Sequence, residues 1–196
     1  MNLIERITNN ITLSAESQMN LIEELGEDIA LAGERLAQCL LQDGKLLICG
    51  NGVSAAIAEA FTSHLLNYFE HERPPLPALC LCSNHSTTTA IGTDSGFHEI
   101  YAKQIRTFGN EKDLLIAICS NGNSANTVKA IQAAHEKNMG IIVLTAGGGG
   151  DIERMLNPED IELRVPSTTR AHIHLCHLLI VHCLLDLIDA QIFGLE

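Results

Sequence analysis

Short apolar runs alternate with longer segments of helical apolar spacing along most of this 196-residue chain. Five of the runs are apolar almost throughout, which predicts strands that are buried on both faces of a parallel sheet. The predicted strands cover residues 45–49, 78–82, 114–118, 140–144 and 161–165. The predicted helices between and after them cover about residues 53–69, 97–108, 123–138 and 168–191. This alternation predicts an α/β fold, a three-layer αβα sandwich with a five-stranded parallel sheet.

Before the first predicted strand, the apolar residues follow helical spacing only, which predicts helices and no strand. The pattern begins with the apolar residues Leu3, Ile4, Ile7 and Ile11. It continues to about residue 25, and a second helix is expected over residues 27–42. We therefore divide a single domain into a helical segment, residues 1–42, and an αβα core, residues 43–196. Within the core, the glycine run at residues 147–150 predicts a flexible loop after the fourth strand.

Composition narrows the range of partners. The chain has 24 acidic and 12 basic residues and a formal net charge of −12, which argues against direct binding of nucleic acid. The apolar segment at residues 173–190 contains three histidines and two aspartates, so we expect a core helix there and no membrane span. Seven cysteines without a Cys-x-x-Cys pair are typical of free thiols in a reducing compartment, which predicts a cytoplasmic protein.

One short motif occurs twice. Residues 49–55 read Cys-Gly-Asn-Gly-Val-Ser-Ala and residues 119–125 read Cys-Ser-Asn-Gly-Asn-Ser-Ala. Each copy follows a predicted strand and precedes a predicted helix, so both lie at the carboxyl edge of the sheet, where α/β proteins bind ligands. Free N–H groups at a helix N-terminus and a serine hydroxyl together bind anions. The two turns therefore predict a site for a phosphorylated ligand, although Ser54 and Ser124 also suit simple helix capping.

Two other nucleotide-binding motifs are absent from the sequence. Neither turn reads Gly-x-Gly-x-x-Gly, which argues against a Rossmann dinucleotide site. The chain also has no Gly-Lys-Ser or Gly-Lys-Thr, so it contains no P-loop.

The chain resembles the SIS (sugar isomerase) family over nearly its whole length. The resemblance is carried by Cys-Gly-Asn-Gly-Val-Ser at 49–54, Glu-Arg-Pro-Pro-Leu-Pro-Ala at 72–78, Asp-Leu-Leu-Ile-Ala-Ile at 113–118, Gly-Asn-Ser-Ala-Asn at 122–126, Asp-Ile-Glu-Leu-Arg-Val-Pro at 160–166 and Cys-Leu-Leu-Asp-Leu-Ile-Asp at 183–189. It implies a flavodoxin-like SIS fold whose N-terminal helices build a homotetramer. Two groups in the family are similar to this chain. One is the phosphoheptose isomerases, which convert sedoheptulose 7-phosphate to a heptose 7-phosphate for lipopolysaccharide precursors. The other is the non-catalytic proteins that associate with the replication initiator DnaA.

The resemblance also implies which residues meet the phosphorylated sugar. The implied binding residues are Asn51, Gly52, Ser54, Asp94, Ser120, Asn121, Ser124 and His174. The second turn of the isomerases usually reads Ser-Thr-Ser-Gly-Asn-Ser, and two of these hydroxyls are missing at residues 119–124. Asn121 still offers a donor through its amide. Asp94 is equally suited to a turn.

The catalytic positions depart further from the family. A ketose–aldose isomerisation needs one group to remove a proton beside the carbonyl and another to return one. The glutamate of phosphoheptose isomerases corresponds to His64, a histidine one turn earlier to Ala60, and the glutamine and histidine of the last helix to His174 and His182.

Three interpretations follow. His64 and His182 are the acid and base, because imidazole exchanges protons near neutral pH. Alternatively, His64, His174 and His182 bind a metal, which the resemblance implies is zinc, although His174 and His182 are about 12 Å apart along a helix. In the third interpretation, these histidines are relics or ordinary packing and hydrogen-bonding residues in a site that no longer turns over, as expected of a non-catalytic adaptor.

Overall fold

The computed structural model describes residues 2–195 and contains one five-stranded, all-parallel sheet with the order β2-β1-β3-β4-β5. The strands are β1 (Leu46–Gly50), β2 (Ala78–Cys80), β3 (Leu114–Ile118), β4 (Gly140–Ala146) and β5 (Ile161–Val165). The predicted α/β architecture is therefore confirmed. The prediction was least accurate for β2, which ends at Cys80, and for β4, which continues to Ala146.

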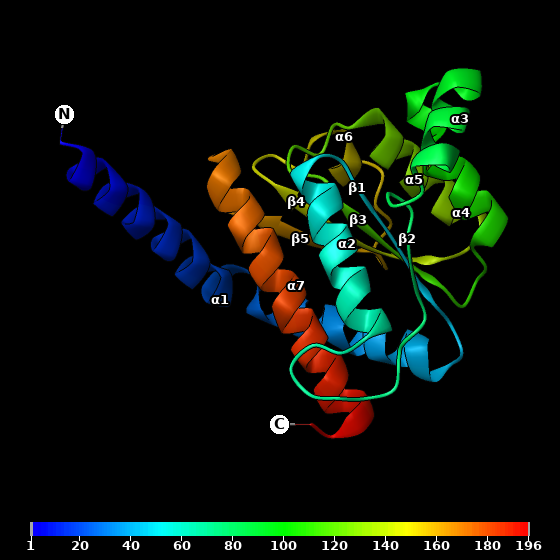
Figure 1. Cartoon of the computed structure of the whole chain (residues 1–196), viewed down its shortest axis with the longest axis horizontal. Helices are drawn as coiled ribbons and strands as arrows, with labels where there is room; N and C mark the ends of the chain where they lie inside the picture. Colours follow the sequence, from blue (N-terminus) through cyan, green and yellow to red (C-terminus); the bar gives the residue numbers. More distant parts are fainter. Residues whose placement is uncertain (1, 196) are drawn as a thin grey trace.

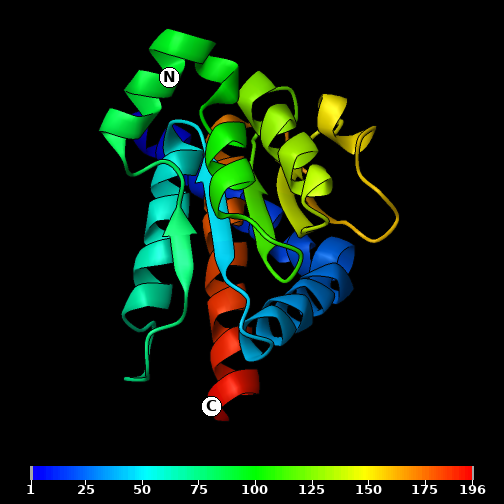
Figure 2. The ribbon, with the colours of Figure 1, turned by 90° about the vertical axis from the view of Figure 1, so that its right-hand side faces the viewer.

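Helices cover both faces of the sheet (Figure 1). The helices α1 (Leu3–Leu41), α2 (Val53–Leu66) and α7 (Arg170–Phe193) lie on one face, and α4 (Ala102–Phe108) and α5 (Ala125–Glu136) lie on the other. Figure 2 shows the same layers from the side. Successive strand residues point to opposite faces, so Leu46 and Ile48 join the first core whereas Leu47 and Cys49 join the second.

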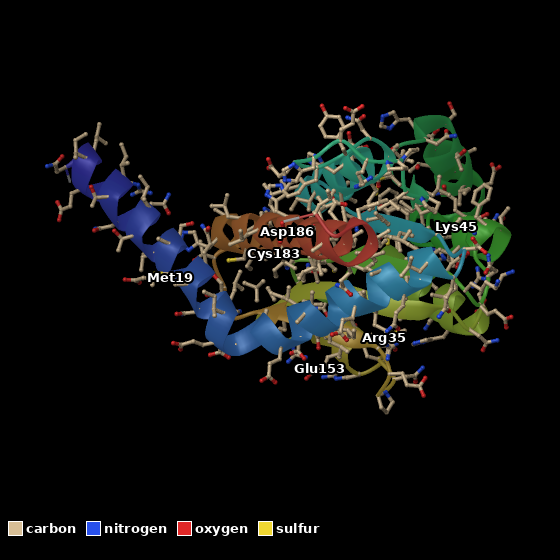
Figure 3. All side chains as sticks on the ribbon, turned by 90° about the horizontal axis from the view of Figure 1, so that it is seen from below. Met19, Arg35, Lys45, Glu153, Cys183 and Asp186 are labelled. Atoms are coloured by element: carbon tan, nitrogen blue, oxygen red, sulfur yellow. The ribbon has the colours of Figure 1, made fainter. Side chains whose placement is uncertain are left out.

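The N-terminal segment is a single 39-residue helix, α1, and the prediction of two helices was wrong. Gly26 lies in the helix interior, where glycine costs about 1 kcal/mol relative to alanine. Buried residues on both sides of it, Leu21 and Leu25 before and Leu36 after, pack against the core and offset that cost. The first part of α1 extends away from the body, and the helix changes direction before it crosses beneath the core (Figures 1 and 3).

Two short elements precede α4. The helix α3 (His85–Ser95) was not predicted, and none of its residues is buried, so its sequence carries no apolar stripe. Asn84 begins it by accepting a hydrogen bond from the backbone N–H of Thr87 at 2.9 Å. The helix predicted over residues 97–108 is divided into η1 (Phe97–Glu99) and α4.

The last helix, α7, is a core helix. It is the one helix within residues 2–195 that is long and apolar enough to cross a membrane by length and composition. However, α7 packs against α1, α2 and β5, and ten of its residues are buried in the fold. Its apolar character is explained by this burial, as the histidines and aspartates of its sequence suggested.

Candidate functional site

The two Asn-Gly turns lie side by side, because β1 and β3 are neighbours and Gly50 pairs with Ile118 at the end of the register. A reciprocal pair of amide hydrogen bonds joins them. Asn51 Nδ2 donates to Asn126 Oδ1 and Asn126 Nδ2 donates to Asn51 Oδ1, each at 2.8 Å. Tyr101 fixes the first turn further, since its hydroxyl donates to the carbonyl of Gly50. One amide N–H of Asn51 is therefore committed to holding the turns together.

The glycine of each turn has a backbone conformation that other residues rarely adopt. Gly52 has φ of 56° and Gly122 has φ of 67°. A Cβ atom at Gly122 would also lie 1.9 Å from the carbonyl oxygen of Gly149. The glycine run predicted as a flexible loop thus packs against the second turn, and Ile152 N donates to Gly122 O at 3.0 Å.

A pocket of about 390 Å³ opens between the two turns and the start of α7. Its lining includes Asn51, Gly52, Ser54, Ser120, Asn121, Ser124, Arg170 and His174. Seven of the eight predicted binding residues are therefore brought together. Asp94 is not, since it is exposed on α3 and does not line the pocket.

The serine hydroxyls of the pocket are not used for helix capping. Ser54 is the second residue of α2 and Ser124 is the N-cap residue of α5, and neither helix has a side-chain capping bond. The side chain of Ser54 is only 3% exposed, yet no described residue forms a hydrogen bond with its hydroxyl. Within residues 2–195, these hydroxyls are left to donate to a ligand, as the anion-binding interpretation requires.

Arg170 also lines the pocket and was not predicted from the sequence. It is the first residue of α7, which follows the end of β5 at the carboxyl edge of the sheet, and it lines the pocket together with the turns. Burial and, secondarily, the charge of Arg170 lower the pKa of His174 below its ordinary value. His174 is therefore a neutral hydrogen-bonding group near neutral pH. The sequence did carry a signal for Arg170, because a basic residue stands at the start of the last predicted helix.

His64 and His182 form a separate pair farther along α2 and α7. Their ring centroids are 6.2 Å apart, and Phe69 lies against both rings at 5.2 and 5.3 Å. His64 Nδ1 is 3.2 Å from the carbonyl oxygen of Tyr68. A carbonyl only accepts, so this contact places a proton on Nδ1, and in the neutral ring the lone pair is then on Nε2. Neither histidine lines the pocket between the turns.

A buried ion pair holds the end of α2 against α7 beside these histidines. Arg73 Nε donates to Asp189 Oδ1 at 2.6 Å, and both side chains are almost fully buried. The same guanidinium donates to the carbonyls of His64 and Leu65, at the C-terminal end of α2. Arg73 therefore fixes the backbone of His64, although it does not touch the imidazole.

The donor set of one chain does not fit a zinc site. Zinc in proteins takes three or four side-chain ligands. Within residues 2–195, no group of three or more His, Cys, Asp or Glu side chains is placed to hold a metal ion. His174 lines the pocket, whereas His64 and His182 face each other farther along the helices. Binding of zinc by the three histidines thus stays a prediction.

The fold and the two turns define a class of protein. A parallel sheet of this order, with paired Asn-Gly-x-Ser turns facing a pocket at its carboxyl edge, is the arrangement expected of a SIS domain. Residues 12–146 match the family described as SIS domain. The chain belongs to the SIS domain family.

Within this family, several relatives that match the chain over nearly its full length are named phosphoheptose isomerase. It is 48% identical to the phosphoheptose isomerase of Chromohalobacter salexigens over 194 residues, which cover 99% of this chain and 98% of that protein. It is 45% identical to the phosphoheptose isomerase of Azoarcus sp. over the full length of both. The solved structure of a phosphoheptose isomerase from Francisella tularensis superposes with a TM-score of 0.94 at 46% identity, covering 96% of this chain and 99% of that one.

Proposed function

We propose that this protein acts as a phosphoheptose isomerase, interconverting sedoheptulose 7-phosphate and an aldose heptose 7-phosphate. The observation that carries the proposal is the placement of an anion pocket and a histidine pair on the same two helices. Both α2 and α7 start at the pocket, and His64 and His182 lie about 15 and 12 Å along them from Ser54 and His174. An extended seven-carbon sugar with a terminal phosphate is suited to bridging such a separation.

The histidine pair supplies the chemistry that isomerisation requires. In the neutral ring, Nε2 of His64 removes a proton from C1 of the ketose and returns it to C2 of the resulting enediol. His182, on the facing helix, passes a proton between the oxygens on C2 and C1, so that the carbonyl moves from C2 to C1. Phe69 covers both rings and limits their contact with water.

The relatives favour the isomerase over the adaptor interpretation. Proteins named phosphoheptose isomerase match this chain at 44–48% identity over nearly its full length. Binding of the replication initiator DnaA stays a prediction, which a pull-down with the purified initiator tests.

Turnover of sedoheptulose 7-phosphate, followed by NMR with and without added zinc, tests the proposal. The expected result is formation of the aldose isomer. His64→Ala and His182→Ala should each lower kcat by about 100-fold or more, because general acid–base groups contribute about 10²–10⁴ in rate. His71→Ala, which removes an exposed histidine of the following loop, is the matched control and should leave kcat unchanged.

Two outcomes would contradict this assignment. Absence of turnover both with and without zinc would contradict the proposed isomerase activity. Turnover that survives both substitutions would leave the enzymatic function standing but would show that His64 and His182 are not its acid and base.

We also propose that the protein is a cytoplasmic homotetramer. Four apolar side chains at the start of α1, Leu3, Ile4, Ile7 and Ile11, are each more than half exposed. An apolar groove of about 460 Å³ lies farther along α1, between it and α7, and its lining includes Met19 and Cys183, which Figure 3 labels. Apolar surface of this extent supports burial against further copies of the chain. All seven cysteines are free thiols, which supports a reducing compartment.

A further inference from the structure

The pocket between the turns carries a positive charge that nothing around it neutralises. Among the described residues that line it, Arg170 is the one permanent cation and none is a carboxylate. Four other arginines, Arg73, Arg106, Arg154 and Arg164, form ion pairs with acidic side chains. Arg170 has no such partner within residues 2–195, although the chain has twice as many acidic as basic residues.

The place of Arg170 in its helix is unfavourable without a ligand. It is the first residue of α7, and the N-terminus of a helix carries a partial positive charge that repels a cation. The helices α2 and α5 also start at this pocket, which is lined by Val53, the first residue of α2, and by Ser124, the N-cap residue of α5. Three helix N-termini and a guanidinium thus share one pocket, and a bound anion would reverse the repulsion among them.

Ser54 independently indicates a ligand. The residue is only 3% exposed and lines the pocket, and no described group forms a hydrogen bond with its hydroxyl. The hydroxyl oxygen is not one of the fully buried polar atoms, so a ligand in the pocket can reach it and supply the missing partner.

We propose that Arg170 is a phosphate-binding residue, whose guanidinium pairs with the dianionic phosphate held by Ser54, Ser120 and Ser124. This inference rests on the proposed function for the identity of the sugar, but it concerns phosphate binding and not turnover. Arg170 gives the site its preference for a phosphorylated over an unphosphorylated sugar. Guanidinium binds phosphate oxygens through two parallel hydrogen bonds, which ammonium does not reproduce.

Calorimetric titration of the purified protein with inorganic phosphate and with sedoheptulose 7-phosphate tests the inference. Arg170→Gln should weaken both by about tenfold to hundredfold, the usual value of a hydrogen bond to a charged group. Arg170→Lys should lose less affinity for both ligands than Arg170→Gln, because it keeps the positive charge. KM should rise by the same factor as the dissociation constant, while kcat stays within about threefold because the reacting carbons lie far from the phosphate. Binding of unphosphorylated sedoheptulose should not change.

Arg35→Gln is the matched control, because it removes the same charge from α1, away from the pocket and without an ion-pair partner in the described chain (Figure 3). A thermal unfolding series adds a readout that does not need turnover. Without phosphate, Arg170→Gln should unfold at the same or a higher temperature than the parent, and phosphate should stabilise it less.

The outcomes separate the two proposals. Equal phosphate affinity in Arg170→Gln and Arg35→Gln overturns the role of Arg170, whatever the turnover. Phosphate binding that depends on Arg170 in a protein without turnover supports the inference and contradicts the isomerase. A parent protein that binds neither phosphate nor the sugar phosphate overturns both.

Discussion

His177 is a fully buried histidine whose ring has one hydrogen bond. Its Nε2 donates to the carbonyl oxygen of Thr145 at 3.0 Å, and its Nδ1 is buried without a described partner. Burial lowers the pKa of His177 from 6.5 to about 4. The native protein therefore holds this ring neutral, in contrast to an exposed histidine of the unfolded chain.

His177 should make stability depend on pH below neutrality. Between pH 6.5 and about 4 the unfolded chain binds a proton at this ring and the native state does not, so stability falls as the pH falls. The loss is complete near pH 4 and amounts to roughly 3 kcal/mol. Urea unfolding at several pH values should show His177→Gln less stable than the parent at pH 7, with the difference shrinking toward pH 4. A difference that is constant with pH would contradict this assignment.

The residues of the turns were predictable, whereas their partners were not. Asn-Gly-x-Ser after an apolar strand has few local conformations, so the sequence indicated the pocket and its serines. The bond from Asn51 to Asn126 and the ion pair of Arg73 with Asp189 join residues 75 and 116 positions apart. Contacts of this kind depend on how the helices pack, and no local pattern in the chain records them.

Among the elements, the buried strands were the easiest to predict and the exposed helix α3 was the hardest. A strand that is apolar on both faces stands out in any window of the sequence, and β3 and β5 have the predicted bounds. The low helix propensity of Gly26 led to the wrong prediction of two separate helices, because tertiary packing keeps α1 continuous through this residue.

The junction of α2 and α7 depends on the Arg73–Asp189 ion pair. Asp189→Asn should lower the free energy of unfolding by about 3–5 kcal/mol, because it leaves the buried guanidinium without a counter-charge. The double variant Arg73→Met with Asp189→Leu should lose less stability than Asp189→Asn, since it buries no unpaired charge. Urea unfolding of the parent, the single variant and the double variant measures their free energies of unfolding and ranks them. A single variant as stable as the parent would show that the pair contributes little.

The whole molecule has an apolar face that it does not itself cover. Leu3, Ile7 and Ile11 lie about five helical turns before Leu21, Leu25 and Ile29, and so occupy the same side of α1. The later three pack into the core, whereas the earlier three are exposed. The sequence could indicate the stripe, but a single chain does not reveal the geometry of the assembly that would bury it.

Placing a charge on this face should dissociate the oligomer. Ile7→Glu puts a carboxylate in the apolar stripe, and sedimentation should show a smaller species with unchanged helix content, since Ile7 has no part in the core of one chain. Asn9→Glu adds the same charge on the opposite side of α1 and should leave the oligomer intact. A parent that sediments as a monomer would contradict the proposed tetramer.

The reciprocal hydrogen bonds between the side-chain amides of Asn51 and Asn126 also bear on the chemical stability of the site. Asn51 precedes Gly52, a sequence in which side-chain amides are prone to spontaneous hydrolysis, and asparagine is among the thermolabile residues. Hydrolysis would replace a donor by a carboxylate that only accepts, so Asn126 Oδ1 would lose the hydrogen bond from residue 51, whereas Asn126 Nδ2 could still donate to the new carboxylate. It would also place a negative charge beside Ser54 in an anion pocket. Asn121 also precedes a glycine and lines the pocket, but only hydrolysis at Asn51 would break a hydrogen bond between the two turns.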